Sequence, residues 1–250
     1  MIRPIATSQE TIEALLKRAV RKATPIRRDF VWQGRRGKRR PGPLADFVRR
    51  RDLRALLLYL LFRGVASKEP WDSRISAKVW ARALDMGATN EAVAGVSKVW
   101  GRLVERRLVA RKRDRRQARV FALQEDGSGE VYSHPGIDQK GEAYFQLPHA
   151  FWTAAEQWHR KLDLAELAML LIALSLPDEF TLVYERAPKQ FGISADTAQR
   201  GLKGLQQKGL LKMRKVFKPA PLAPDGYTEE RRYTLQPPFR RRKAAPEAAA

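Results

Sequence analysis

The sequence predicts a mainly α-helical chain with small β-hairpins, organised as two domains joined by a linker. Three observations lead to this fold class. Apolar residues recur at helical spacing through most of the 250 residues. Capping residues and glycines bound these runs, and each half then shows two strand-like runs separated by a polar or proline-rich turn. The order helix, helix, helix, strand, loop, strand occurs twice, and a repeated order is stronger evidence than either half alone.

The N-terminal region, residues 1–43, is expected to hold one helix and a flexible basic arm. Thr7 and Glu10 have the spacing of a capping box, and the apolar residues that follow recur at helical spacing, which predicts a helix over Thr7–Lys22. Its apolar face must pack on the body of the protein or on a second copy of the chain, so this helix is also the expected interface of a homodimer. Residues 34–43 have no apolar side chain other than proline, which favours a flexible segment.

Residues 44–124 are expected to form the first domain. Capping candidates at Ser76 and at Thr89 or Asn90 precede two of its apolar runs. The expected helices are Asp52–Arg63, Ala77–Met86 and Glu91–Arg107, and the expected strands are Leu108–Arg113 and Arg119–Gln124. Residues 125–143 are rich in turns and carry acidic instead of basic side chains, which indicates the interdomain linker.

Residues 144–239 are expected to form the second domain, and residues 240–250 a basic disordered tail. The second domain begins with a short strand and an aromatic-rich helix and then repeats the order of the first. The expected strands are Tyr144–Leu147, Leu210–Phe217 and Arg231–Leu235, and the expected helices are Pro148–Lys161, Leu164–Leu176, Tyr184–Phe191 and Ala195–Lys208. The tryptophans at apolar helical positions are expected in the core: Trp80, Trp100, Trp152 and Trp158.

The charge balance indicates the class of partner. The chain has 49 lysines and arginines against 27 acidic residues, a net charge of +22. Such an imbalance points to a polyanion or an anionic membrane and says nothing about fold. The longest apolar run, Leu164–Leu176, is too short for a membrane span and contains Glu166, so no membrane partner is expected. Met1–Lys22 lacks the apolar core of a signal peptide, and a cytoplasmic, nucleoid-associated protein is expected.

The most specific segment is Phe191–Leu211, with the sequence FGISADTAQRGLKGLQQKGLL. Gly192 permits the positive φ of a tight turn between two helices, and Ser194 can cap the helix that follows. The apolar residues from Ala198 to Leu205 then share one face, which is expected to pack against the preceding apolar helix. The opposite face carries polar and charged side chains.

This segment resembles the helix-turn-helix core of winged-helix DNA-binding regulators such as the GntR and MarR groups. The residues that match that pattern are Gly192, Ile193, Ser194, Thr197, Ala198, Gly201, Leu202, Leu205, Gly209, Leu210 and Leu211. The resemblance implies that this helix enters the major groove of double-stranded DNA. The contacts it implies are Asp196, Thr197, Gln199, Arg200 and Lys203 on the helix and Lys212, Arg214 and Lys215 on the strand after it. Gln199 and Arg200 are the expected base contacts.

The first half carries a weaker copy of this motif. Leu103 takes the place of Leu205, and the expected core face is Val96, Val99, Trp100 and Leu103. The outer face is poorer in polar groups and offers Ser97, Lys98 and Arg102. The hairpin after it is richer in charge, with Arg111, Lys112, Arg113, Arg115, Arg116 and Arg119. We therefore expect the second domain to specify sequence and the first to clamp phosphates, since phosphate contacts fix register and base contacts specify.

The basic arm adds further expected DNA contacts. Between Lys17 and Arg40 there are eleven lysines or arginines and one acid, Asp29. The run Lys38–Pro41 resembles an AT-hook, which binds the minor groove, but it lacks the glycine between the last two arginines. The arm residues expected to contact DNA are Arg35, Arg36, Lys38, Arg39 and Arg40.

No catalytic, metal or cofactor site is expected. The three histidines lack metal-ligand spacing, the chain has no cysteine, and neither a phosphate-binding glycine loop nor a nucleophile motif occurs. A transcriptional regulator is the first expectation. A replication initiator of a plasmid-like element is the alternative, because tandem winged helices also resemble plasmid initiators. A non-specific nucleoid or RNA-binding protein is the third class, since phosphate attraction alone does not distinguish among these.

Overall fold

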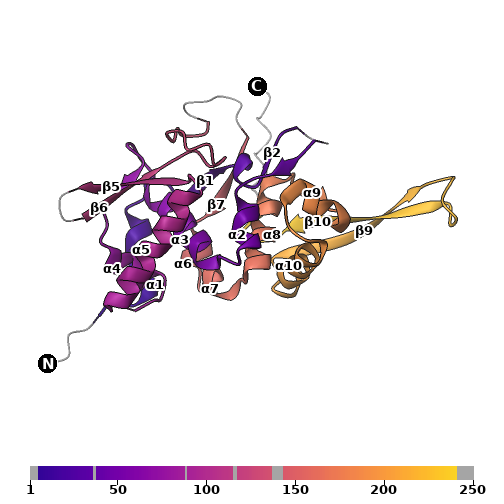
Figure 1. Cartoon of the computed structure of the whole chain (residues 1–250). Helices are drawn as coiled ribbons and strands as arrows, with labels where there is room; N and C mark the ends of the chain where they lie inside the picture. Colours follow the sequence, from indigo (N-terminus) through magenta and orange to yellow (C-terminus); the bar gives the residue numbers. More distant parts are fainter. Residues whose placement is uncertain (1–4, 36–37, 88, 115–116, 137–142, 241–250) are drawn as a thin grey trace, which may run out of the picture.

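The computed structural model describes residues 5–35, 38–87, 89–114, 117–136 and 143–240 (Figure 1). Helices account for 43% and strands for 22% of the chain, and the strands form four small sheets. The protein is therefore mixed α/β, and the expected mainly α class with small β-wings was wrong. Two causes are visible. Five of the strands were not predicted, because runs of two to five residues are too short to show a period of two, and the C-terminal hairpin is longer than its proline-rich sequence indicated.

The N-terminal region begins with helix α1 (Ser8–Lys17), which has the expected capping box between Thr7 and Glu10. The elements that follow are β1 (Ala23–Arg27), the 3₁₀ turn η1 (Arg28–Phe30), β2 (Trp32–Gln33), β3 (Arg40–Pro41) and α2 (Leu44–Arg49). The apolar face of α1 is buried inside the chain, against α4, α6 and α3. Of the two docking options that the sequence left open, packing on the body is the one observed.

The expected flexible arm contains a short hairpin. Strands β2 and β3 pair in antiparallel register, with Trp32 opposite Pro41 and Gln33 opposite Arg40. Arg28 and Arg39 lie over the Trp32 ring, with their guanidinium carbons 4.2 and 4.4 Å from its centroid. Cation–π stacking on a buried indole thus orders residues that have no apolar side chain of their own.

The first repeated unit consists of α3 (Leu53–Val65), β4 (Asp72–Ser73), α4 (Ala77–Ala83), α5 (Asn90–Glu105), β5 (Val109–Asp114) and β6 (Gln117–Ala122). Its strands form a three-stranded sheet in the order β4-β6-β5. Asp52, Ser76 and Thr89 cap the three helices through their side chains, as the sequence predicted for Ser76 and Thr89. The third helix, α5, buries the expected face from Val96 to Leu103.

The second unit repeats this order. It is preceded by β7 (Tyr144–Pro148), α6 (Ala150–Thr153) and α7 (Trp158–Lys161), and it consists of α8 (Leu164–Ser175), β8 (Glu179–Thr181), η2 (Tyr184–Arg186), α9 (Ala187–Phe191), α10 (Ala195–Gln207), β9 (Leu211–Pro219) and β10 (Tyr227–Leu235). Its sheet has the order β8-β10-β9, the same as in the first unit. The single helix expected over Pro148–Lys161 is two short helices, because Gln157 adopts a left-handed conformation with φ 49°.

The two units are joined by more than a linker. Strand β1 pairs antiparallel with β7 along its whole length, from Ala23 opposite Pro148 to Arg27 opposite Tyr144. The start of the expected linker is also fixed, because the fully buried Glu125 lies 2.7 Å from Arg27 and 3.4 Å from Arg63. The two hairpins, β5–β6 and β9–β10, point to opposite ends of the molecule (Figure 1). The chain is thus one elongated body with a similar three-helix unit in each half.

Candidate nucleic-acid interface

Helix α10 is held against α8 by an unusually close approach. Gly192 ends α9 with φ 68°, and the Ser194 side chain accepts a hydrogen bond from the Thr197 amide, so the turn and cap form as the sequence predicted. A Cβ atom at Gly201 would lie 2.4 Å from the carbonyl oxygen of Ala165. The glycines of α10 therefore allow backbone-to-backbone packing, and they fix the orientation of its opposite face.

The opposite face of α10 is exposed and polar. Asp196, Gln199, Arg200 and Lys203 are all exposed, whereas Thr197 is half-buried with its hydroxyl 2.8 Å from that of Ser194. Arg200 and Lys203 form no ion pair with any residue that the structure describes. These side chains are free to bind an external acceptor, which is what a base-contacting helix requires.

Helix α5 presents a different surface. Lys98 is exposed, but the Ser97 carbonyl accepts a hydrogen bond from Arg111 at 3.4 Å. Arg102 donates two hydrogen bonds to Asp52, at 2.8 and 2.9 Å. Burial acts to raise the pKa of Asp52, but the hydrogen bonds and charge of Arg102 outweigh it, so this pKa lies below its ordinary value. Arg102 is therefore committed to an internal ion pair, which the sequence did not indicate.

The first hairpin carries unpaired positive charge. Arg111, Lys112 and Arg113 are exposed on β5. Arg119 on β6 instead forms an ion pair with Asp72, and its guanidinium lies 4.6 Å from the Phe121 ring centroid. Arg115 and Arg116, at the turn of this hairpin, lie outside the described residues. The described part of the hairpin fits phosphate binding, because β5 offers three exposed cations, with Arg111 and Arg113 on one face of the strand and Lys112 on the other.

In the second hairpin most cations are paired with acids. Arg214 pairs with Glu179 at 2.6 Å and Lys215 with Glu229 at 2.9 Å. Lys218, Arg231 and Arg232 also contact these acids or Glu230. Hydrogen bonds from these cations lower the pKa values of Glu179, Glu229 and Glu230, so all three carboxylates stay charged. Lys212 is exposed and forms no such pair in the described chain. Exposed pairs of this kind contribute little to stability, but they engage five of the six cations of Leu211–Leu235, which keeps a net charge of +3.

The cations of the arm also divide into exposed ones and one that the fold engages. Arg35, Lys38 and Arg40 are exposed, whereas Arg39 is half-buried between Trp32 and Phe191, with ring-centroid distances of 4.4 and 5.8 Å. Arg36 lies outside the described residues. Arg39 therefore attaches the hairpin of the arm to the second unit, and its neighbours remain available to solvent.

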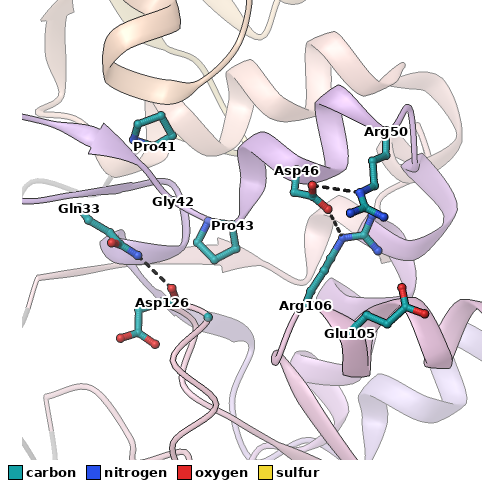
Figure 2. A pocket seen from close by; sticks show the side chains of 10 residues that line it. Gln33, Pro41, Gly42, Pro43, Asp46, Arg50, Glu105, Arg106 and Asp126 are labelled. Atoms are coloured by element: carbon teal, nitrogen blue, oxygen red, sulfur yellow. Dashed lines mark hydrogen bonds and ion pairs between the residues drawn. The ribbon is translucent and has the colours of Figure 1, made fainter.

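A hollow of about 370 Å³ lies between the arm and the C-terminal end of α5 (Figure 2). Several of its polar groups are engaged within the protein. Gln33 donates to the Asp126 carbonyl at 2.9 Å, and Asp46 accepts hydrogen bonds from Arg50 and Arg106 at 3.0 and 2.9 Å. These contacts join the arm, α2 and α5, so this hollow is a structural junction and not a ligand site.

Sequence reasoning missed one basic group. Arg51 and Arg54 are exposed where α2 turns into α3, and neither forms an ion pair with a described residue. Their neighbours Arg49 and Arg50 both pair with Asp46. The run Arg49-Arg50-Arg51 could have drawn attention to this corner, but its closeness to α10 is a feature of the fold alone.

Comparison of the chain with protein-family models, with curated proteins and with solved structures gives no match. Within the described part of the chain, none of the helices has both the length and the apolarity that crossing a membrane requires. In the same residues, no three histidine or carboxylate side chains converge as metal ligands would.

Proposed function

We propose that this chain is a sequence-specific double-stranded DNA-binding protein that uses a winged-helix module in each half, and that it acts as a transcriptional regulator at the nucleoid. The observation that carries the proposal is the exposed, unpaired polar face of α10, from Asp196 to Lys203, on a helix whose other face is fixed against α8. A helix held in this way keeps its side chains in one geometry, as direct contact with base edges requires.

The two modules have different roles in this proposal. Helix α10 specifies sequence, chiefly through Gln199 and Arg200. The β5–β6 hairpin of the first module binds phosphates, because its exposed cations on β5 form no ion pair within the described residues, whereas Arg102 on α5 is bound to Asp52. Arg35, Lys38 and Arg40 of the arm add non-specific attraction. Good bidentate base contacts contribute about 1–3 kcal/mol of discrimination each, and the phosphate contacts supply most of the salt-dependent affinity.

The test is selection of bound sequences from a random duplex pool at about physiological salt, repeated with the variants Arg200→Ala and Arg113→Ala. We expect a defined motif for the wild-type protein. Arg200→Ala should relax the motif at one or two positions. Arg113→Ala should weaken all sequences alike and lower the slope of log K against log salt by about 0.9. If Arg200→Ala weakens all sequences alike and Arg113→Ala relaxes the motif, the roles of the two modules are reversed. Failure to select any motif, with affinity that collapses in salt, would contradict sequence-specific binding.

Replication initiation is the second candidate, and one observation favours it. Strands β1 and β7 fuse the two units, so that a single chain presents two unequal helix-turn-helix units. Such a chain suits an asymmetric site bound by a monomer. A selected or genomic target made of an array of direct repeats would support an initiator, whereas one isolated site upstream of a gene would support a regulator. A palindrome would instead indicate a homodimer, for which the buried apolar face of α1 offers no surface.

A further inference from the structure

The corner between α2 and α3 lies where the two units meet. Helix α2 contacts α3 of the first unit and α8 of the second, and in Figure 1 it lies between them. Two hollows open on either side of this corner. One, of about 640 Å³, has Arg51, Arg54, Arg102 and His159 in its lining, and the other, of about 620 Å³, has Arg51, Thr197 and Arg200. Arg51 is common to both hollows.

This arrangement links the outer faces of the two third helices. Arg102 of α5 is bound to Asp52, which directly follows Arg51 in the chain. On the other side, Arg51 shares a hollow with Arg200 of α10. A path of basic side chains therefore runs from α5 over the corner to α10, and the corner is its midpoint.

The acids along this path are mostly occupied. Asp52 is bound by Arg102 and Arg106, Asp85 pairs with Arg160 at 3.3 Å, and Asp163 accepts a hydrogen bond from the Glu166 amide at 2.8 Å. Asp196 is the remaining carboxylate, and it lies on the exposed face of α10, where an acid can accept from a cytosine amino group. Among the described residues, neither Arg51 nor Arg54 forms an ion pair with any of these acids, although Asp163 and Asp196 line the hollow that Arg51 shares with Arg200.

The backbone presents Arg51 rigidly. Its φ of 54° is in the left-handed region, which a side chain other than glycine or asparagine rarely adopts. The amides of Arg51 and Asp52 donate to the carbonyls of Val48 and Phe47, at 3.1 and 2.9 Å, and Asp52 caps α3. Such a conformation persists only where the surroundings determine it, and it is frequent at binding sites.

We infer that the α2–α3 corner is a third DNA contact, in which Arg51 and Arg54 bind backbone phosphates between the half-site of the first unit and that of α10. This inference rests on the proposed function. It means that one duplex follows one face of the molecule across both units, and that the spacing between the half-sites is set by the corner. Neither α5, α10 nor the two hairpins supply this contact.

The experiment measures duplex binding as a function of salt for the double variant Arg51→Asn, Arg54→Gln. Asparagine tolerates the left-handed backbone, so the corner is kept. The control variant Lys17→Gln, Arg18→Gln removes the same charge from two exposed residues at the end of α1. We expect the corner variant to lower the slope of log K against log salt by about 1.8, the value for two phosphates, and to lower affinity about tenfold at low salt with the selected motif unchanged. The control should change the slope much less.

Ethylation interference on the selected duplex then maps the phosphates concerned. Wild-type protein should show interference between the two half-sites, and the corner variant should lose it. Equal slopes for the corner and control variants, or interference that is unchanged by the corner variant, would overturn the inference while leaving the proposed function intact. If wild-type protein does not bind duplex DNA at all, the proposed function itself fails. Equal melting temperatures of the three proteins show that a loss of binding is not a loss of folding.

Discussion

The contact between α10 and α8 allows a sharp test, because two effects of opposite sign compete in the variant Gly201→Ala. Alanine favours a helix interior over glycine by about 1 kcal/mol. The added Cβ, however, would lie 2.4 Å from the Ala165 carbonyl oxygen and 2.6 Å from the Met169 Cγ. An ordinary contact is roughly 1 Å longer, and a backbone carbonyl in the first turn of α8 cannot move aside as a flexible side chain would. Overpacking of this kind costs about 1–3 kcal/mol.

We therefore expect Gly201→Ala to lower the free energy of unfolding by about 1–2 kcal/mol net, measured by urea denaturation. The matched control is Gly101→Ala in α5, where no heavy atom of the described chain lies within 4 Å of the new Cβ. That control should raise stability by about 0.5–1 kcal/mol, because only the helix preference acts. If Gly201→Ala proves as stabilising as Gly101→Ala, α10 is not packed against α8 in this way, and the orientation of its exposed face would have to be revised.

Two further predictions concern buried ionisable groups. Glu125→Gln should lower the free energy of unfolding by about 3–5 kcal/mol, because Arg27 and Arg63 would keep buried charges without their carboxylate; the exposed Glu130→Gln is the control and should change stability by less than about 0.5 kcal/mol in the same denaturation assay. Burial lowers the pKa of His159 to about 4, so the unfolded chain takes up this proton first as the pH falls. The free energy of unfolding should therefore drop between pH 6.5 and 4, by about 2–3 kcal/mol in total from this group. The variant His159→Gln should remove that part of the pH dependence. If the pH profile of the variant equals that of the wild-type protein, the imidazole of His159 is not buried in its neutral form.

The helices were predictable because their signals are local. Capping side chains at Thr7, Ser76 and Ser194 lie within three residues of the amides that they bind, so the sequence pattern contains both partners. The core face of α5 and the exposed face of α10 follow from the helical period in the same way.

The strands and the links between units were not predictable from local patterns. Strand β1 contains Pro25 and reads as part of a basic arm, and its partner β7 lies more than a hundred residues away in the chain. Arg27 and Glu125 are 98 positions apart. The sequence placed one in a flexible arm and the other in a linker, because composition describes a segment and says nothing of the segment that it meets.

In the candidate interface, too, local sequence identifies the basic residues, but distant segments determine which of them are paired. Arg102 was expected to face DNA because it lies on the outer side of α5, but Asp52, 50 positions earlier, binds it. Arg214 and Lys215 were expected to face DNA because the resemblance implies contacts on the strand after α10, and Glu179 and Glu229 pair with them. A basic residue is identified by sequence, whereas its availability depends on acids that only the fold brings near.

This internal pairing gives a physical reason for unequal modules. Most cations of the second hairpin are paired with acids, whereas Arg200 and Lys203 of α10 are not. In the first unit, Arg102 of α5 is bound to Asp52, and β5 keeps three exposed cations. A helix such as α10 can make only a few bidentate base contacts, at about 1–3 kcal/mol each, which is too little to hold a duplex against physiological salt without phosphate contacts. The free cations of the first hairpin, the arm and the α2–α3 corner can supply those contacts without specifying sequence. The +22 charge of the chain is then not spread evenly over its surface. Within the described residues it is left without acid partners on β5, on the exposed part of the arm and at the α2–α3 corner.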